Sequence, residues 1–374
     1  MQKTHFRISV AAPLITHSDI LKISECLKSG WISGISPYVE EFERKFAEYC
    51  GCKYGVATNS GTTALHLALA TLKVGPGDEV IIPTFTMIAT ANAVAYTGAK
   101  PVLVDSEAET WNIDPRKIES KINKKTKVIM PVDTYGHPAN MDAIREIAVK
   151  HGLHIVEDAA EAHGAEYKSR KAGSLGDVGC FSFYANKIIT TGEGGMLVTN
   201  DFDLAERARW LRAHAFGRGG KHFYHEEIGF GYRMSGLQAA LGISQLSRLT
   251  QNVERRRKNA RLYNELLSGL GDKVILPPEA PWAKNVYWMY SILVRKGFGV
   301  SRNKLIELLA REGIESRTFF YPIHVQPAYS SLASSGAFPV ADTLSRSGIN
   351  LPSGNDLTEQ QIHDVCDAVK RHAR

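Results

Sequence analysis

The chain has 374 residues, of which 44% are apolar and 22% are charged, so it can bury a sizeable core and is too apolar for a disordered protein. Its formal charge of +6 is mild for this length, and no block of five or more like charges marks a nucleic-acid-binding arm. No apolar stretch reaches the roughly 18 residues of a membrane span, and the first residues lack the apolar core of a signal peptide, so we expect neither nucleic acid nor membrane as a partner.

Between about residues 55 and 200, short apolar runs alternate with helical patterns. The runs are continuously apolar and rich in Val, Ile and Phe, which is typical of strands covered on both faces. They are Glu79–Pro83, Pro101–Asp105, Lys127–Val132, His154–Glu157, Gly179–Tyr184 and Gly195–Thr199. Helical spacing is found at Thr62–Lys73, Asp114–Ile122 and Met141–Lys150. This alternation predicts a mostly parallel sheet with helices on both faces.

After residue 200 the pattern becomes helical and then mixed. We expect helices at Asp203–Ala213 and, as one long element, Ser235–Leu267, before the prolines near residue 278. The remainder combines a strand-like run, Tyr287–Val294, with helical patterns at Arg302–Glu312 and Glu359–His372. The sequence therefore predicts an α/β protein with a large domain over residues 1–250 and a small α+β domain over residues 251–374.

The five cysteines are scattered and odd in number. Cys50 and Cys52 are separated by one residue rather than the two common in zinc sites. We expect reduced cysteines in a cytoplasmic protein, with no metal site.

The first chemical motif is the stretch Ala57–Ala64, in which a strand runs into a glycine-containing turn that opens a helix. Unpaired backbone N–H groups at a helix N-terminus suit a phosphate group. The alternative is ordinary helix capping by Ser60 or Thr62.

The second motif is Ile155–Gly164, in which an apolar strand ends in a pair of acids. Asp158 then lies where ligands bind in open α/β sheets, beyond the carboxyl ends of the strands. A buried carboxylate needs a cation or hydrogen bonds, and a protonated pyridine nitrogen would serve. The alternative is that Asp158 caps a turn, and for His163 we expect a structural role.

The third motif is Phe181–Gly195, in which Lys187 lies among apolar residues just past a strand and before a glycine cluster. Desolvation lowers the pKa of a lysine and frees its amine for Schiff-base chemistry. The alternative is a lysine that extends its amine to solvent. Together, a phosphate cradle, Asp158 and a lysine 29 residues later (187 − 158 = 29) are the groups that pyridoxal phosphate requires.

These stretches resemble the DegT/StrS-type sugar aminotransferases. The resemblance runs from Ser29–Ser33 to Gly348–Ser353 and is strongest at Glu157–Ala165 and Asn186–Gly195. It implies the aspartate-aminotransferase fold (type I of the pyridoxal-phosphate enzymes), with a mostly parallel sheet in the large domain.

The resemblance also implies roles for single residues. Lys187 is expected to carry the cofactor as a Schiff base, Asp158 to pair with the ring nitrogen, and Glu161 to lie near the ring hydroxyl. The phosphate is expected to be held by the amides of Gly61 and Thr62 and the hydroxyl of Ser182.

Within the family the sequence is most similar to the GDP-perosamine synthases, on the evidence of residues 314–324 and 348–353. That similarity implies transfer of an amino group from L-glutamate to GDP-4-keto-6-deoxy-D-mannose, in bacterial O-antigen sugar biosynthesis, by a homodimer with active sites at the subunit interface. Trp31, Tyr321 and His324 are candidates for lining the sugar-nucleotide site, with packing in the core or the interface as the alternative.

Three positions depart from the family pattern. Met87 stands where an aromatic usually stacks on the cofactor ring, although its polarisable sulfur can still cover a ring face. Asp133 stands where histidine is more usual. Gly231 stands where an asparagine often reaches the partner subunit's cofactor phosphate, and glycine cannot supply that hydrogen bond.

Other functions stay open at this point. The substrate could be a dTDP- or UDP-linked keto sugar. Sugar dehydratases resemble this family but have histidine at the lysine position, so Lys187 argues against that reaction. A regulatory protein without turnover is disfavoured by the intact pair of Lys187 and Asp158.

Overall fold

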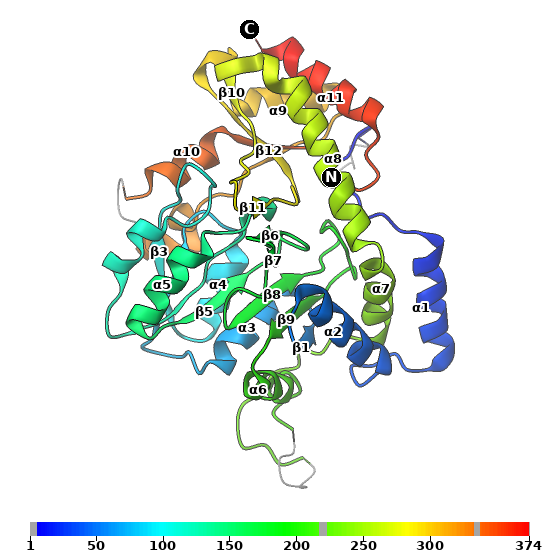
Figure 1. Ribbon diagram of the computed structural model, residues 1–374, viewed down its shortest axis with the longest axis vertical. Coiled ribbons are helices and arrows are strands. Elements are labelled where there is room, and N and C mark those ends of the chain that lie inside the picture. Colours follow the sequence, from blue (N-terminus) through cyan, green and yellow to red (C-terminus); the bar gives the residue numbers. More distant parts are fainter. Residues whose placement is uncertain (1–5, 217–222, 333–336, 374) are drawn as a thin grey trace.

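The computed structural model describes residues 6–216, 223–332 and 337–373. Its centre is a seven-stranded sheet in the order β1-β9-β8-β5-β4-β2-β3 (Figure 1). The strands are β1 (Tyr54–Thr58), β2 (Glu79–Pro83), β3 (Lys100–Val104), β4 (Thr126–Ile129), β5 (His154–Asp158), β8 (Val178–Ser182) and β9 (Gly195–Thr199). Only β9 runs antiparallel to its neighbours in this sheet, which confirms the predicted mostly parallel sheet.

Both faces of this sheet are buried. Val80 and Ile82 of β2 join one apolar cluster, whereas Ile81 between them joins another on the opposite face. Side chains alternate between the two faces of a strand, so a strand covered on both sides must be apolar throughout. This explains the continuous apolar runs in the sequence.

Eleven α-helices lie in the described part of the chain, most of them around the central sheet (Figure 1). They are α1 (His17–Ser29), α2 (Pro37–Cys50), α3 (Gly61–Thr71), α4 (Ile88–Tyr96), α5 (Met141–His151), α6 (Phe202–Arg212), α7 (Gly236–Leu246), α8 (Leu249–Leu267), α9 (Arg302–Arg311), α10 (Pro339–Ser347) and α11 (Glu359–His372).

Two predicted helices were wrong. The segment Asp114–Ile122 forms two 3-10 turns, Pro115–Lys117 and Glu119–Lys121. Asp114, Pro115 and Ile118 are the buried residues of this short segment, and a helix of this length needs more packing than that to persist. The segment Ser235–Leu267 is two helices, α7 and α8, which break at Ser247 and Arg248.

The C-terminal part contains a four-stranded antiparallel sheet in the order β10-β12-β14-β13. Its strands are β10 (Val274–Ile275), β12 (Tyr290–Val294), β13 (Arg317–Thr318) and β14 (Gly348–Leu351), and a third sheet joins β11 (Ala283–Lys284), β6 (Glu166–Tyr167) and β7 (Arg170–Lys171). The four-stranded sheet shares an apolar cluster with α9, α11 and the second half of α8.

The long helix α8 belongs to both apolar cores. Leu249 and Val253, in its first turns, pack in the core of the central sheet. Ala260, Tyr263 and Leu267 pack in the C-terminal core. A domain boundary at residues 250 and 251 therefore stays a prediction.

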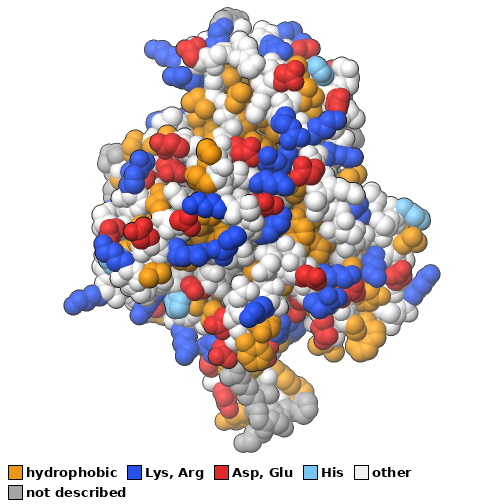
Figure 2. Space-filling view, in the orientation of Figure 1, with side chains coloured by type: hydrophobic (Ala, Val, Ile, Leu, Met, Phe, Trp, Pro, Cys, Tyr) orange, Lys and Arg blue, Asp and Glu red, His pale blue; other side chains and the backbone are white. Residues whose placement is uncertain are grey.

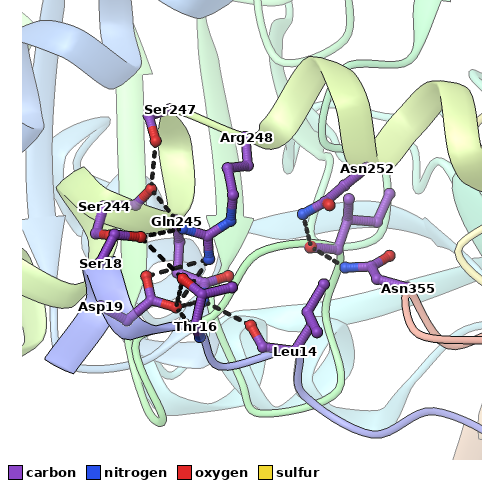
Figure 3. A network of polar contacts seen from close by, with 11 residues as sticks. Leu14, Thr16, Ser18, Asp19, Ser244, Gln245, Ser247, Arg248, Asn252 and Asn355 are labelled. Carbon is purple, nitrogen blue, oxygen red and sulfur yellow. Dashed lines mark hydrogen bonds and ion pairs between the residues drawn. The ribbon is translucent and has the colours of Figure 1, made fainter.

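A buried ion pair lies at the break between α7 and α8 (Figure 3). Asp19 of α1 is fully buried, and Arg248 donates to both of its carboxylate oxygens at 3.1 and 2.8 Å. Gln245 Nε2 donates at 3.1 Å and the Thr16 amide at 2.8 Å. Burial alone would raise the pKa of Asp19, but hydrogen bonds from Arg248 and Ser244 outweigh it and lower that pKa. Arg248 thus ties α1 to the start of α8.

On the face shown in Figure 2, cationic and anionic side chains are interspersed. No helix in the described residues is both long enough and apolar enough to cross a bilayer.

Replacing Arg248 tests the contribution of the α1–α8 ion pair. In Arg248→Met the Asp19 carboxylate stays buried but loses its cation, so we expect the free energy of unfolding to fall by roughly 2–3 kcal/mol. Urea denaturation measures this change. Lys304→Met, which removes the exposed pair between Lys304 and Glu307, is the control and should change stability by less than about 0.5 kcal/mol. Equal losses in the two variants would contradict a special role for the buried pair.

Candidate active site

A cavity of about 330 Å³ opens at the carboxyl ends of β5 and β8. Asp158 ends β5, Ser182 ends β8, and both line it. The cavity brings together every cofactor-binding residue predicted from the sequence: Gly61, Thr62, Met87, Asp158, Glu161, Ser182 and Lys187.

Lys187 lies in the turn after β8, where its amide donates to the Tyr184 carbonyl at 2.9 Å. Its side chain is only 10% exposed. The Nζ atom lies 3.7 Å from Glu161 Oε1 and 3.8 Å from the centre of the Trp288 ring. Burial lowers the pKa of Lys187, against the opposing charges of Glu161 and Asp158. A larger share of this amine is therefore neutral, and able to attack an aldehyde, than of a lysine in water.

Asp158 is a buried carboxylate with no cation within ion-pair distance among the described residues, and the charge of Lys187 acts on it from farther away. Its Oδ2 atom accepts from the Thr90 hydroxyl at 2.8 Å, and Oδ1 accepts from the Ala160 amide at 3.3 Å. Burial raises the pKa of Asp158. A cationic N–H group in the cavity would stabilise the charged carboxylate, and a protonated pyridine ring presents such a group.

Glu161 faces Lys187 across the floor of the cavity. One oxygen, Oε2, accepts from the Tyr135 amide at 2.8 Å, which leaves Oε1 directed towards the amine. Burial raises the pKa of Glu161 to about 7, although the charge of Lys187 counteracts it. The carboxyl group can therefore hold or release a proton near neutral pH.

The start of α3 is the segment in which a phosphate cradle was predicted. Ser60 caps this helix, with its hydroxyl accepting from the Thr63 amide at 3.2 Å, so the capping alternative is confirmed, and the phosphate cradle stays a prediction. The amides of Gly61 and Thr62 precede the first intrahelical bonds and line the cavity. A Cβ atom at Gly61 would lie 2.6 Å from the Cβ of Ser182. The close approach of α3 to β8, which brings the Ser182 hydroxyl beside these amides, therefore requires glycine.

The residues present thus fit pyridoxal phosphate. A buried amine, a buried carboxylate without a cation and a helix N-terminus with free amides surround one cavity. His163, by contrast, is fully buried against the rings of Phe46, Phe181 and Phe183, and burial lowers its pKa to about 3. Its role is packing.

The structure shows what surrounds Met87 and Gly231, two of the three positions that depart from the family pattern. Met87 caps α4, with its sulfur accepting from the Ala89 amide at 3.1 Å, and remains 48% exposed at the cavity. A Cβ atom at Gly231 would lie 3.1 Å from Cε1 of His214, so the imidazole edge occupies the space next to this glycine.

Asp133 forms a buried pair with Glu157. The Asp133 Oδ1 atom accepts from the Ala139 amide at 2.9 Å, and Glu157 Oε2 accepts from the Leu175 amide at 3.0 Å. The other oxygen of each has no further partner among the described residues. Burial, and then the charge of Glu157, raise the pKa of Asp133 well above its usual range. Burial therefore favours the protonated form of Asp133, whose hydroxyl can donate to the neighbouring Glu157 carboxylate.

The residues predicted to bind substrate are not among those that line this cavity. Trp31 and Tyr321 are exposed, at 50% and 61%. His324 is occupied within the fold, because its Nδ1 contacts the Thr84 hydroxyl at 2.7 Å and its Nε2 contacts Asp342 at 3.1 Å. The geometry of His324 matches the packing alternative.

Several lining residues were not predicted. Tyr135, Trp288, Arg317, Thr318, Phe320 and Asn350 line the cavity from segments far from the three motifs. The sequence did contain a signal for three of them. Residues 314–324 carry part of the family resemblance and include Arg317, Thr318 and Phe320, but only Tyr321 and His324 were predicted from this stretch.

Comparison with known proteins identifies the family of this chain. The sequence profile of the DegT/DnrJ/EryC1/StrS aminotransferase family matches residues 13–370. A GDP-perosamine synthase of Caulobacter vibrioides is 45% identical over 363 residues, which cover 97% of each chain. A dTDP-3-amino-3,4,6-trideoxy-alpha-D-glucose transaminase of Streptomyces venezuelae is 41% identical over 343 residues, 91% of this chain and 88% of the relative. The structure of Streptococcus pneumoniae Spr1654, described as a sugar aminotransferase in its pyridoxal-phosphate form, is 29% identical, with a TM-score of 0.91 and coverage of 97% and 98%.

Replacing Asp133 tests the buried acid pair through its pH dependence. Asp133 binds its proton more tightly when folded than when unfolded, so the stability linked to it is complete below about pH 4 and is lost as the pH rises. In Asp133→Asn the amide keeps an oxygen for Ala139 and a donor for Glu157 but does not titrate. We expect its free energy of unfolding to fall less between about pH 5 and pH 8 than that of the native protein.

Urea denaturation across this pH range measures the difference between the two proteins. Asp203→Asn, in the exposed first turn of α6, is the control for the loss of one acidic side chain. If the native protein gained stability relative to Asp133→Asn as the pH rose, the assignment of the proton to Asp133 would be wrong.

Proposed function

The chain belongs to the DegT/DnrJ/EryC1/StrS aminotransferase family, whose members depend on pyridoxal phosphate, and we propose that it transfers the amino group of L-glutamate to the keto group of a nucleotide-linked sugar through Lys187. The observation that carries the proposal is the buried Lys187 amine, which shares one cavity with the unpaired Asp158 carboxylate and the amides of Gly61 and Thr62.

Each of these residues has a task in the reaction. When bound, pyridoxal phosphate supplies an aldehyde for amines and a ring that withdraws electrons from the neighbouring carbon. The amides of Gly61 and Thr62 would hold its phosphate, and the Asp158 carboxylate would favour the protonated form of its ring nitrogen. Lys187 would hold its aldehyde, and the amine of Lys187, when free, would move protons as a general acid and base. Glu161 accepts or returns a proton beside this amine.

The position of Arg317 supports the proposal that the substrate is anionic. Among the described residues that line the cavity, Arg317 and Lys187 are the two with cationic side chains. Its guanidinium lies 3.0 Å from Glu315 and is 45% exposed, so it remains accessible. Both proposed substrates are anionic, since glutamate carries carboxylates and a sugar nucleotide carries phosphates.

Within this function we propose GDP-4-keto-6-deoxy-D-mannose as the keto sugar, with GDP-perosamine as the product. The support is the 45% identity to a GDP-perosamine synthase over nearly the whole chain. The second candidate is a dTDP-linked keto sugar, which the 41% identity to a dTDP-amino-sugar transaminase favours. The delivery of the product to a bacterial surface polysaccharide stays a prediction.

We also propose a homodimer with the active site at the subunit interface. Met87 and Tyr184 are each 48% exposed beside the cavity. Exposed apolar side chains also gather on α1 and the segment that follows it, namely Ile20, Leu21, Leu27, Trp31, Ile32 and Ile35. A patch of this kind is typical of a protein interface. The exposed Trp31 then contacts substrate only where a second subunit completes the site.

Replacing Lys187 tests the covalent attachment of the cofactor. We expect Lys187→Ala to retain no cofactor after borohydride reduction and to lose at least about 10³-fold in kcat, because the nucleophile and the proton carrier are the same amine. Mass spectrometry of the reduced protein measures the attachment. Lys171→Ala, which removes a lysine that pairs with Glu166, should behave as the native protein. Covalent attachment in Lys187→Ala would place the reactive lysine elsewhere.

A panel of substrates tests the choice of sugar nucleotide. We expect GDP-4-keto-6-deoxy-D-mannose to be aminated with glutamate, and dTDP- and UDP-linked keto sugars to react at least about 100-fold more slowly in kcat/KM, because unpaired polar groups in a site reject the wrong nucleotide. Mass spectrometry identifies the products. Faster reaction of a dTDP- or UDP-linked sugar would overturn the choice of nucleotide, and a deoxy sugar without an amino group would overturn the transamination.

A further inference from the structure

The turn that carries Lys187 is held by side chains from outside it. The carbonyl before Lys187, that of Asn186, accepts from the Trp288 indole N–H at 2.9 Å. The carbonyl of Ile188, directly after Lys187, accepts from the amides of Asn355 at 2.8 Å and Asn252 at 3.3 Å. In Figure 3 these two amides converge on that carbonyl. The residues on both sides of Lys187 are therefore fixed by remote parts of the chain.

One guanidinium joins these remote parts. Arg256 of α8 is buried, at 3% exposure. Its Nε donates to Asn355 Oδ1 at 2.6 Å, and its Nη1 donates to the Trp288 carbonyl at 2.5 Å. Arg256 thus contacts both Trp288 and Asn355, the residues that hold the carbonyls on either side of Lys187.

The donors of Arg256 set the orientation of the Asn355 amide. A guanidinium can only donate hydrogen bonds, so the oxygen of Asn355 must face Arg256. The amino group of Asn355 is then left to donate to the Ile188 carbonyl. Without the guanidinium, a flipped amide would place its oxygen against that carbonyl.

Arg256 also fixes the residue that covers the Lys187 amine. The Trp288 ring centre lies 3.8 Å from Lys187 Nζ. The residue before it, Tyr287, has a φ of 47°, a conformation that bulky side chains rarely adopt. The hydrogen bond from Arg256 to the Trp288 carbonyl helps hold this strained backbone in place.

Arg256 has no carboxylate within ion-pair distance among the described residues. Burial lowers its pKa to about 10, and burying a guanidinium beside neutral acceptors is unfavourable compared with an apolar side chain. The contacts of Arg256 therefore fix the positions of Asn355 and Trp288, and they do not add the stabilisation of an ion pair.

We propose that Arg256 is a positioning residue for Lys187, which it acts on through Asn355 and Trp288. This inference rests on the proposed role of Lys187. Loss of Arg256 leaves the lysine present but free to depart from its reactive orientation, which slows every step that uses the amine.

The chain provides a matched control in Arg302 of α9. This arginine is also buried, at 8% exposure, and has no carboxylate partner among the described residues. It too donates to one asparagine oxygen, in Asn303, and to one backbone carbonyl, in Gly348, both at 2.7 Å. None of these contacts reaches the turn of Lys187, so Arg302→Met reports the general effect of removing a buried arginine.

The test is the rate at which the apoenzyme attaches pyridoxal phosphate, followed by the visible absorbance of the covalently held cofactor. For Arg256→Met we expect this rate and kcat to fall on the order of 10-fold or more, with KM for glutamate changed less than about 3-fold. Arg302→Met should stay within about 2-fold in rate, even if urea denaturation shows a similar loss of stability.

A second variant keeps the proposal testable if Arg256→Met does not fold. Asn355→Ala removes the link from Arg256 to Ile188 and should slow attachment as well. Where both variants fold, the double variant should be slower by less than the product of the two single effects, because the two residues act in one chain of contacts. Native attachment rates in Asn355→Ala, or equal slowing in Arg256→Met and Arg302→Met, would overturn the proposal. Failure of the native protein to attach the cofactor at Lys187 would instead overturn the proposed function.

Discussion

The pairing of β5 with β8 is the constraint on which the site depends. It places Asp158 opposite Cys180, two residues before the end of β8, so that the turn carrying Lys187 starts beside the carboxylate. The two strands are parallel, and their carboxyl ends meet at one edge of the sheet. The chain thus returns to its starting edge over the 29 positions from Asp158 to Lys187, and α3 also presents its N-terminus at this edge.

Around this pairing, burial governs the electrostatics. It pushes the pKa of Lys187 down and those of Asp158 and Glu161 up, so each charge in the cavity is less stable than in water. The buried pair of Asp133 and Glu157 continues this pattern behind the site. Asp133 does not line the cavity, so its unusual acid changes the hydrogen bonding behind the site and leaves the lining intact.

The sequence was most informative where one short segment carries the whole signal. Periodicity marks the strand Glu79–Pro83 and the helix Glu359–His372, and local motifs mark Lys187 and Asp158, which the fold brings together in one cavity. Trp288 and Arg256 could not be found in this way, since their importance lies in contacts with residues about 100 positions away. The break between α7 and α8 was also missed, and the residue that Arg248 binds there, Asp19, is 229 positions away.

The unpaired Asp158 carboxylate has a consequence for how the protein is maintained in its folded state. A buried anion without a cation is unfavourable for the free protein, and any ligand that brings a cation to it binds the folded chain alone. Folding and cofactor loading are thereby linked equilibria. A higher concentration of pyridoxal phosphate therefore raises the thermal stability of the chain as well as its activity. When the cofactor is depleted, the chain unfolds more readily although its sequence is unchanged.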